Sequence, residues 1–192
     1  MKKSIVLLLF FLLLSGSAIA ADVTFKLKGS YFHPHETAFK DIYGGGVMYG
    51  VEASTEISRH LEMWIDGGYF SKKGELSLTR EETKLRIIPV GGGLRYTLSL
   101  GSIHAYAGIG INYYLYNETN PIGDVNWGKL GGIINVGSFI KIRGNWIIDF
   151  IVCYSYCEMQ PADFKINIGG IEAGVRLGYS IRGKERLSKQ KI

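Results

Sequence analysis

The stretch that decides the fold is LRIIPVGGGLRYTLSLGSIHAYAGIGINYYLY, from Leu85 to Tyr116. It contains two runs of alternating residues, joined by the short segment Ser99–Ser102. In each run, one parity is mostly aliphatic or aromatic and the other is polar or small. Side chains of a strand point to opposite faces with a period of two, so each run predicts a strand with one apolar face. Each run also has about the length of a tilted strand that crosses a bilayer, roughly 9–11 residues.

The same alternation recurs along the chain. With the two runs above, it predicts strands at Val23–Phe32, Gly45–Ile57, Leu61–Phe70, Leu85–Leu98, Ile103–Tyr116, Leu130–Ile142, Trp146–Tyr156 and Ile168–Ile181. Their connections alternate between short ones (58–60, 99–102 and 143–145) and long polar ones (33–44, 71–84, 117–129 and 157–167). Short turns on one rim and long loops on the other are typical of bacterial outer-membrane barrels, whose short turns are periplasmic.

The charged residues indicate which face of each strand looks inward. The apolar face carries no charge in the middle of any strand, and its aromatic residues gather near the strand ends, as in the interfacial girdles of membrane barrels. The sequence therefore predicts an all-β protein, an eight-stranded antiparallel up-and-down transmembrane β-barrel with its apolar face on lipid. The opposite face is predicted to form a structural polar network in the lumen, made of Lys26, Lys28, Glu52, Glu56, Glu62, Asp66, Arg95, His104, Lys141, Asp149, Glu172 and Arg176.

This network is expected to fill the barrel. Eight strands enclose an interior that side chains just occupy. A buried charge without a partner costs several kcal/mol, so we expect the acidic and basic residues to pair and a wide aqueous pore to be disfavoured. We expect His104 to pair with a carboxylate such as Glu56 or Glu62.

The first twenty residues have the features of an export signal. Lys2 and Lys3 precede an apolar run from Ile5 to Leu14, and Ala18-Ile19-Ala20 supplies the small residues of a cleavage site. We predict a signal peptide at residues 1–20, an outer-membrane barrel at 21–181 and a basic periplasmic tail at 182–192. The predicted location is the bacterial outer membrane. The formal net charge falls from +5 to +3 once Lys2 and Lys3 are removed, so charge alone gives no case for nucleic-acid binding.

Several segments resemble a known family. Gly44–Gly46, Gly50–Glu52, Ile88–Tyr96 and Tyr106–Gly110 resemble the small outer-membrane β-barrels of the OmpA, OmpX and opacity type, and the likeness extends over Ala21 to Ile181. Glu172–Tyr179 is similar to the C-terminal signal that the outer-membrane assembly machinery reads, although such chains often end on an aromatic residue and this one continues. The resemblance implies a monomer that contacts outer-membrane lipid and lipopolysaccharide, and the assembly machinery during insertion.

No catalytic, cofactor-binding or metal-binding residue is predicted. Gly91-Gly92-Gly93 lacks the lysine of a phosphate-binding loop, and His33-Pro34-His35-Glu36 fits a solvated loop better than a metal site. Cys153 and Cys157 lie four residues apart on one strand, so their Cα atoms would be ~13 Å apart. A disulfide needs less than ~7 Å, and we therefore expect two free thiols.

The leading functional hypothesis is a non-enzymatic outer-membrane protein with a structural or surface-interaction role through its long extracellular loops. An alternative is an outer-membrane enzyme that modifies lipid A or phospholipid. His104 would be its base, and Ser99, Ser102 and Ser180 are candidate neighbours. A soluble periplasmic lipocalin-like carrier is disfavoured, because its lumen would have to be apolar.

Overall fold

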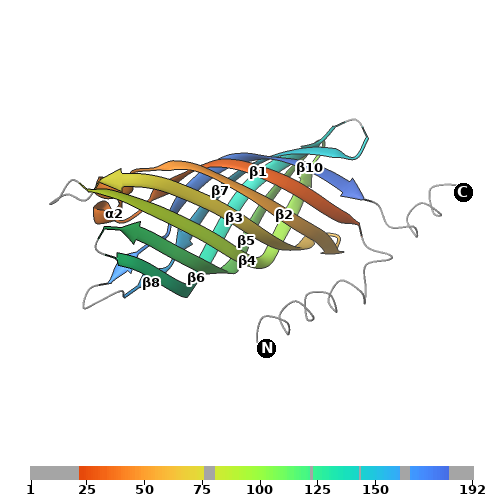
Figure 1. Cartoon of the computed structure of the whole chain (residues 1–192). Coiled ribbons are helices and arrows are strands. Elements are labelled where there is room, and N and C mark those ends of the chain that lie inside the picture. The colour runs from red at the N-terminus through yellow and green to blue at the C-terminus, as the bar shows by residue number, and fades with distance from the viewer. Residues whose placement is uncertain (1–21, 76–80, 122, 143, 161–164, 182–192) are drawn as a thin grey trace, which may run out of the picture.

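The computed structural model describes residues 22–75, 81–121, 123–142, 144–160 and 165–181. Its main strands are β1 (Val23–Pro34), β2 (Gly46–Ser58), β3 (Leu61–Glu75), β4 (Glu82–Leu100), β5 (Ile103–Asn120), β6 (Gly123–Lys141), β7 (Trp146–Tyr156) and β10 (Gly170–Ile181). Each pairs antiparallel with its neighbour in the chain, and β1 pairs with β10 to close the ring (Figure 1). The predicted fold class, an eight-stranded antiparallel up-and-down barrel, is confirmed. The predicted signal peptide (1–20) and basic tail (182–192) lie outside the described residues.

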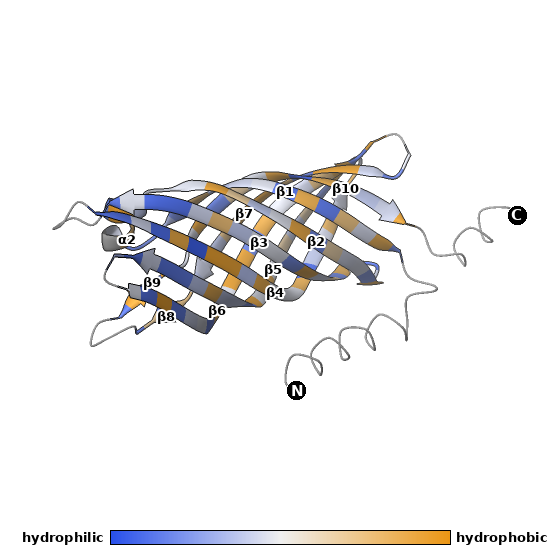
Figure 2. Ribbon diagram, viewed as in Figure 1, coloured by the Kyte–Doolittle hydropathy of each residue, from blue (hydrophilic) through white to orange (hydrophobic). Residues whose placement is uncertain are grey.

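The outer face of the barrel is apolar, as the alternation predicts. Leu27, Ile109 and Leu130 are 66%, 67% and 64% exposed, and apolar and polar residues alternate along the strands (Figure 2). Exposed aromatic residues gather toward the two ends of this surface, with Tyr31, Tyr49, Tyr69, Tyr113, Tyr154 and Tyr156 toward the long-loop end, and Tyr96, Trp146 and Tyr179 toward the short-turn end. An apolar band between two aromatic girdles is the surface that a bilayer covers.

Four strands extend well beyond their predicted ends, and the first of them is β3, which has 15 residues and continues to Glu75. β4, β5 and β6 have 19, 18 and 19 residues, and β5 stays paired with β6 as far as Asn120 opposite Gly123. The predicted loops 71–84 and 117–129 were therefore wrong in large part, because the described residues there continue the strands beyond the apolar band. Polar residues such as Asn117, Glu118 and Thr119 ended the predicted strand, but water allows polar residues on both faces of a strand outside lipid.

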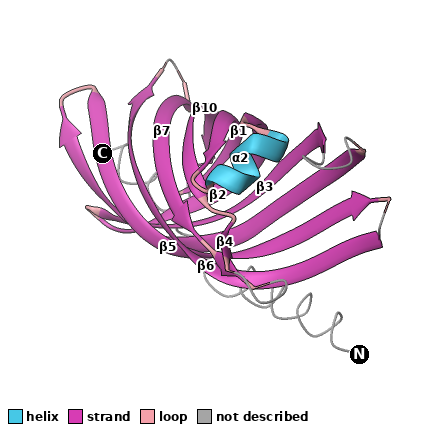
Figure 3. Ribbon diagram, turned by 90° about the vertical axis from the view of Figure 1, so that its left-hand side faces the viewer, coloured by secondary structure: helices cyan, strands magenta, loops and turns pink. Residues whose placement is uncertain are grey.

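The first long connection is a cap rather than a solvated loop. Helix α2 (Thr37–Tyr43) follows β1 and lies inside the ring of strands at the long-loop end (Figure 3). The hydroxyl groups of Tyr43 and Thr83 are hydrogen-bonded at 3.0 Å, and burial raises the pKa of Tyr43 above its usual range. No helix in the described part of the chain is long and apolar enough to cross a membrane.

The long-loop half of the lumen is apolar, which corrects the expectation of a polar lumen throughout. The buried residues there are Phe32, Phe39, Tyr43, Met48, Phe70, Leu85, Ile87, Tyr114, Cys157, Met159 and Ile168. They come from strands, from α2 and from the last predicted loop, which contains the short strands β8 (Glu158–Met159) and β9 (Ile166–Asn167). The inward-facing residues of the strands thus change from charged to apolar toward this end.

Two glycines show why the central hairpin is rich in this residue. A Cβ atom at position 110 would lie 2.7 Å from Cζ2 of Trp64, which is buried in the lumen. A Cβ atom at position 91 would overlap Oδ1 of Asn112. At position 91, glycine is therefore explained by packing, because lumen side chains occupy the space that a larger residue would need.

The contacts of α2 lead to a first prediction. Phe39 is 5% exposed and packs on Tyr43, with ring centroids 5.2 Å apart. Phe39→Ala should remove the main apolar anchor of the cap, because Phe→Ala in a core typically costs about 3–5 kcal/mol. We expect faster hydrogen exchange and easier proteolysis at 37–43 while the strands stay protected, whereas the exposed control Thr37→Ala should change neither. Loss of strand protection in Phe39→Ala would contradict a separate cap.

Candidate functional site

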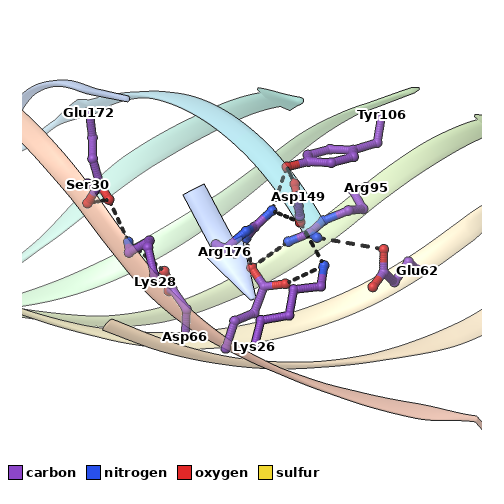
Figure 4. Close-up of polar contacts among 11 residues, drawn as sticks. Lys26, Lys28, Ser30, Glu62, Asp66, Arg95, Tyr106, Asp149, Glu172 and Arg176 are labelled. Atoms are coloured by element: carbon purple, nitrogen blue, oxygen red, sulfur yellow. Dashed lines mark hydrogen bonds and ion pairs between the residues drawn. The ribbon is translucent and has the colours of Figure 1, made fainter. Parts of the chain in front are cut away.

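The centre of the lumen holds a network of buried charges, in which Lys26, Arg95, Asp149 and Arg176 lie close together (Figure 4). Glu52 of β2 is the anion that joins most of them. Oε1 of Glu52 lies 3.1 Å from Nζ of Lys26 on β1, and Oε2 lies 2.7 Å from Nη2 of Arg95 on β4. Nη1 of Arg176 on β10 contacts the same Oε2. One carboxylate therefore joins cations from three other strands.

Asp149 of β7 is the second anion of this network. Its Oδ2 lies 2.7 Å from Nη2 of Arg176 and 3.1 Å from Nζ of Lys26. The hydroxyl of Tyr106 on β5 donates to Oδ1 at 2.8 Å and accepts from Nη2 of Arg176 at 2.5 Å. We call this group the central belt; its members are Lys26, Glu52, Arg95, Tyr106, Asp149 and Arg176.

The central belt excludes water. The side chains of its ion pairs are at most 3% exposed. The guanidinium of Arg95 also lies over the rings of Tyr106 and Trp64, at 4.8 and 5.6 Å from their centroids, which adds cation–π attraction. Water does not reach these groups, so no aqueous channel passes the described part of the lumen at this level.

A second ionic cluster lies beside the belt. Nζ of Lys28 is 2.8 Å from Oε1 of Glu172 and 3.8 Å from Oδ2 of Asp66. The hydroxyl of Ser30 donates to Oε1 of Glu172 at 2.6 Å. These groups therefore pair across β1, β3 and β10, and one lysine faces two carboxylates.

Four predicted network residues lie nearer the short-turn end. Glu62 is at the edge of the belt, with Oε2 3.7 Å from Nη1 of Arg95. Glu56, His104 and Lys141 instead line an open polar cavity of about 180 Å³, where Glu56 and Lys141 are exposed. The lumen is open at this cavity and closed at the belt. Only some of the predicted network residues therefore belong to one buried network of ion pairs.

His104 is hydrogen-bonded to a hydroxyl group, and Glu56, one of the two expected carboxylates, attracts it electrostatically. Nδ1 of His104 is 2.9 Å from Oγ of Ser99, and its ring stacks on Phe139 with centroids 4.7 Å apart. Ser99 lies directly opposite His104 in the β4–β5 hairpin, which brings the two side chains together. Glu62, one of the expected partners, contacts Arg95 instead.

The two cysteines are free and buried, in agreement with the sequence argument. Cys153 faces the lumen opposite Asn135 of β6 and Glu172 of β10. Cys157 packs in the apolar cluster near the long-loop end. In the described part of the chain, no group of three or more His, Cys, Asp or Glu residues is placed to hold a metal ion.

Sequence reasoning missed the uncharged members of the lumen. Tyr106, Ser30 and Trp64 have the same inward parity as the charged residues, so alternation alone would have placed them there. Their hydrogen bonds and ring contacts were not predictable, because each depends on which residues of distant strands lie at the same height.

Comparisons with known proteins give the fold. No protein-family model and no curated protein sequence matches the chain. Among solved structures, it is similar to Neisserial surface protein A (TM-score 0.61, 13% identity, 83% of this chain and 96% of that one). It is also similar to the N-terminal β-barrel domain of Pseudomonas aeruginosa OprF (0.57, 12%, 84% and 98%). A third is the attachment invasion locus protein Ail of Yersinia pestis, in complex with the heparin analogue sucrose octasulfate (0.56, 11%, 84% and 99%). The chain therefore has the fold of eight-stranded outer-membrane β-barrels.

The geometry of the central belt makes a second prediction. Glu52→Gln should lower the free energy of unfolding by about 3–5 kcal/mol, because it removes the anion that three buried cations share. The matched control is Glu82→Gln, which breaks an exposed ion pair with Lys73 and should cost no more than about 1 kcal/mol. Urea unfolding in lipid vesicles measures both variants. Equal losses would contradict a special role for the buried carboxylate.

Proposed function

We propose that this protein is an integral protein of the bacterial outer membrane, with a non-enzymatic role in envelope structure or surface interaction. The observation that carries the proposal is an apolar outer surface around a filled interior. Leu27, Ile109 and Leu130 face outward, whereas Lys26, Glu52 and Arg176 are buried inside. This arrangement suits lipid outside and no transported solute inside. It disfavours a soluble carrier, whose apolar residues would face the lumen.

Because the interior is filled, we expect other molecules to contact the ends of the barrel. The belt blocks the middle of the lumen, and α2 packs on the apolar cluster at the long-loop end. In outer-membrane barrels the long-loop end faces the exterior of the cell. The parts of this protein that are free to meet other molecules are therefore the extended strands and the connections at that end.

One face of this end carries three basic residues beside two acidic ones, the exposed Glu75 and Glu82, which lie directly opposite each other. Lys84 and Arg86 of β4 are exposed, and Lys84 lies directly opposite Lys73 of β3. Like charges directly opposite each other in a sheet are destabilising. Glu82 offsets part of this repulsion, with Oε1 2.5 Å from Nζ of Lys73. An anionic partner would offset the rest, so this basic face (Lys73, Lys84 and Arg86) is the surface where we place the interaction.

Ail offers a parallel for such a partner. The structure of that protein was determined in complex with sucrose octasulfate, a heparin analogue. The identity of 11% carries over no binding residue, so the argument for this chain rests on its own lysines and arginine. A sulfated or phosphorylated surface polymer has the chemistry that the basic face would recognise.

A second candidate function rests on the Ser99–His104 hydrogen bond. A serine beside a histidine is the first requirement of a nucleophilic hydrolase, and this pair faces the open cavity of the short-turn end. A lipid-modifying enzyme would use His104 as the base. The pair lies in a lumen cavity rather than on the lipid-facing surface where its substrate would be, so we rank this function second.

The basic face is tested with the folded protein in detergent micelles and heparin as the probe. The double variant Lys84→Ala/Arg86→Ala should bind heparin several-fold more weakly at low salt, and the difference should shrink toward about 1 M salt because the charges are then screened. Lys72→Ala, on the same hairpin but with the opposite parity, is the control and should bind nearly as the wild type does. Equal binding by all three proteins would remove the basic face from the proposal.

The enzymatic alternative makes a different prediction. His104→Ala should leave the lipid A and phospholipid composition of cells that carry the protein unchanged, because we assign His104 a packing role on Phe139. Mass spectrometry of extracted lipids measures this. A lipid species that depends on the wild-type protein and disappears in His104→Ala would favour the enzyme instead.

A further inference from the structure

Two histidines lie where β1 ends, at the long-loop end of the barrel. His33 pairs with Ile171 of β10, and Pro34, the last residue of β1, pairs with Gly170. The backbone N–H of His35 then donates to the carbonyl oxygen of Gly169 at 3.0 Å. Residues 33–35, which were expected in a solvated loop, therefore stay paired with the wall of the barrel.

Both histidine side chains are on the outer face of this wall. His33 and His35 are exposed, whereas Pro34 between them is fully buried. The ring of His35 also meets the ring of Tyr154, an exposed residue of β7, edge-on with centroids 6.3 Å apart. Residues at i and i+2 of an extended chain lie on one face, with Cα atoms roughly 6.5–7 Å apart. The two imidazole rings are therefore neighbours on the outside of the barrel.

The backbone that carries the two rings is stiff. Proline fixes its own φ angle near about −65°. The residue before a proline is restricted to extended conformations, which here applies to His33. Because Pro34 is also buried, the backbone between the histidines has little freedom left to lose when both side chains bind one ligand.

The ring nitrogens of both histidines are available for a ligand. Among the described residues, neither ring takes part in a hydrogen bond or an ion pair. The other two histidines of the chain differ in this respect. Nδ1 of His60 is 3.2 Å from the carbonyl oxygen of Thr97, and Nδ1 of His104 is hydrogen-bonded to Ser99.

We propose that His33 and His35 bind one divalent transition-metal ion, and that Cu²⁺ binds most tightly. Neutral imidazole is a ligand of Cu²⁺, Zn²⁺ and Ni²⁺, and the affinity of a given site rises along this series of metals to Cu²⁺. A metal ion about 2.0–2.1 Å from each nitrogen bridges the pair once the two rings lean toward each other. The site has two protein ligands, so water or another external donor fills the remaining positions.

The position of the pair determines where the ion comes from. Tyr31 and Tyr154 belong to the aromatic girdle of the long-loop end, and the two histidines lie beside them. In outer-membrane barrels this end faces the exterior of the cell, so the ion would come from the external medium. The inference goes beyond the proposed surface interaction, because the metal site and the basic face share no residue.

The test uses the full mature protein, folded in detergent micelles, and the iminodiacetate complex of Cu²⁺ as the probe. This chelator leaves room on the ion for further ligands, and electron paramagnetic resonance reports how many imidazole groups occupy it. The wild type should bind one ion per chain through two imidazoles. His33→Ala and His35→Ala should each weaken binding at least about tenfold, because even the residues that only orient metal ligands are worth about 10–100-fold in affinity.

His60→Ala is the matched control. His60 is also exposed, but it lies in the turn between β2 and β3 with no second histidine two residues away. This variant should bind copper as the wild type does. The metal site is wrong if His33→Ala and His35→Ala bind as tightly as the wild type, or if His60→Ala loses as much affinity as they do.

A transplanted pair tests the spacing of the ligands. Tyr31 lies two residues before His33 on the same outward face and is 55% exposed. The double variant Tyr31→His/His35→Ala should therefore regain the two-imidazole binding that His35→Ala loses. If this variant binds copper as weakly as His35→Ala does, two histidines on one face of β1 do not make the site.

Two further measurements separate the metal site from folding and from the proposed function. Heat-modifiability on gels should show that each variant is a folded barrel, so that a loss of copper reports a lost ligand. Heparin binding should be the same in His33→Ala and the wild type, because the basic face is intact. Parallel losses of heparin and copper would contradict a separate metal site.

Discussion

The pairing of β1 with β10 is the constraint on which the rest of this structure depends. It runs without interruption from Val23 opposite Ile181 to Pro34 opposite Gly170. In lipid, an open sheet edge would leave backbone groups without partners at several kcal/mol each, so the ends of the sheet must meet. Closure after eight strands also fixes a narrow interior, just wide enough for side chains to fill. Every inward residue therefore has to fit with residues from the opposite wall.

The central belt is the result of that fit. Glu52 reaches cations of β1, β4 and β10 only because the registers of all these strands place them at one height. A shift of one residue would move the whole set to the opposite face of a strand, where the charges would meet lipid. The apolar cluster under α2 imposes the same condition on Phe32, Met48 and Leu85. The central belt and the apolar cluster therefore oppose the same register errors. A shifted register would leave the buried charges of the belt unpaired, and it would expose the apolar area of the cluster.

The sequence was sufficient for the parts of this structure that depend on one strand at a time. A period of two located every strand of the barrel and divided lipid-facing from lumen-facing residues, because both properties are local. It failed where the environment changes along a strand. The polar residues 117–120 continue β5 beyond the apolar band, and the inward-facing residues become apolar toward α2. It named Ser99 as one of three candidate neighbours of His104 without singling it out. It could not gather three cations on Glu52, because those contacts depend on the register between strands. The short segment TAFKDIY carries no helix signal apart from the tertiary contacts of Phe39 and Tyr43.

A filled interior also changes how the outer surface should be interpreted. In a barrel with a pore, a lipid-facing residue has only to be apolar, and the lumen carries the selectivity. In this barrel the buried belt leaves no such role to the lumen, so departures from a uniform apolar surface gain weight as signs of function.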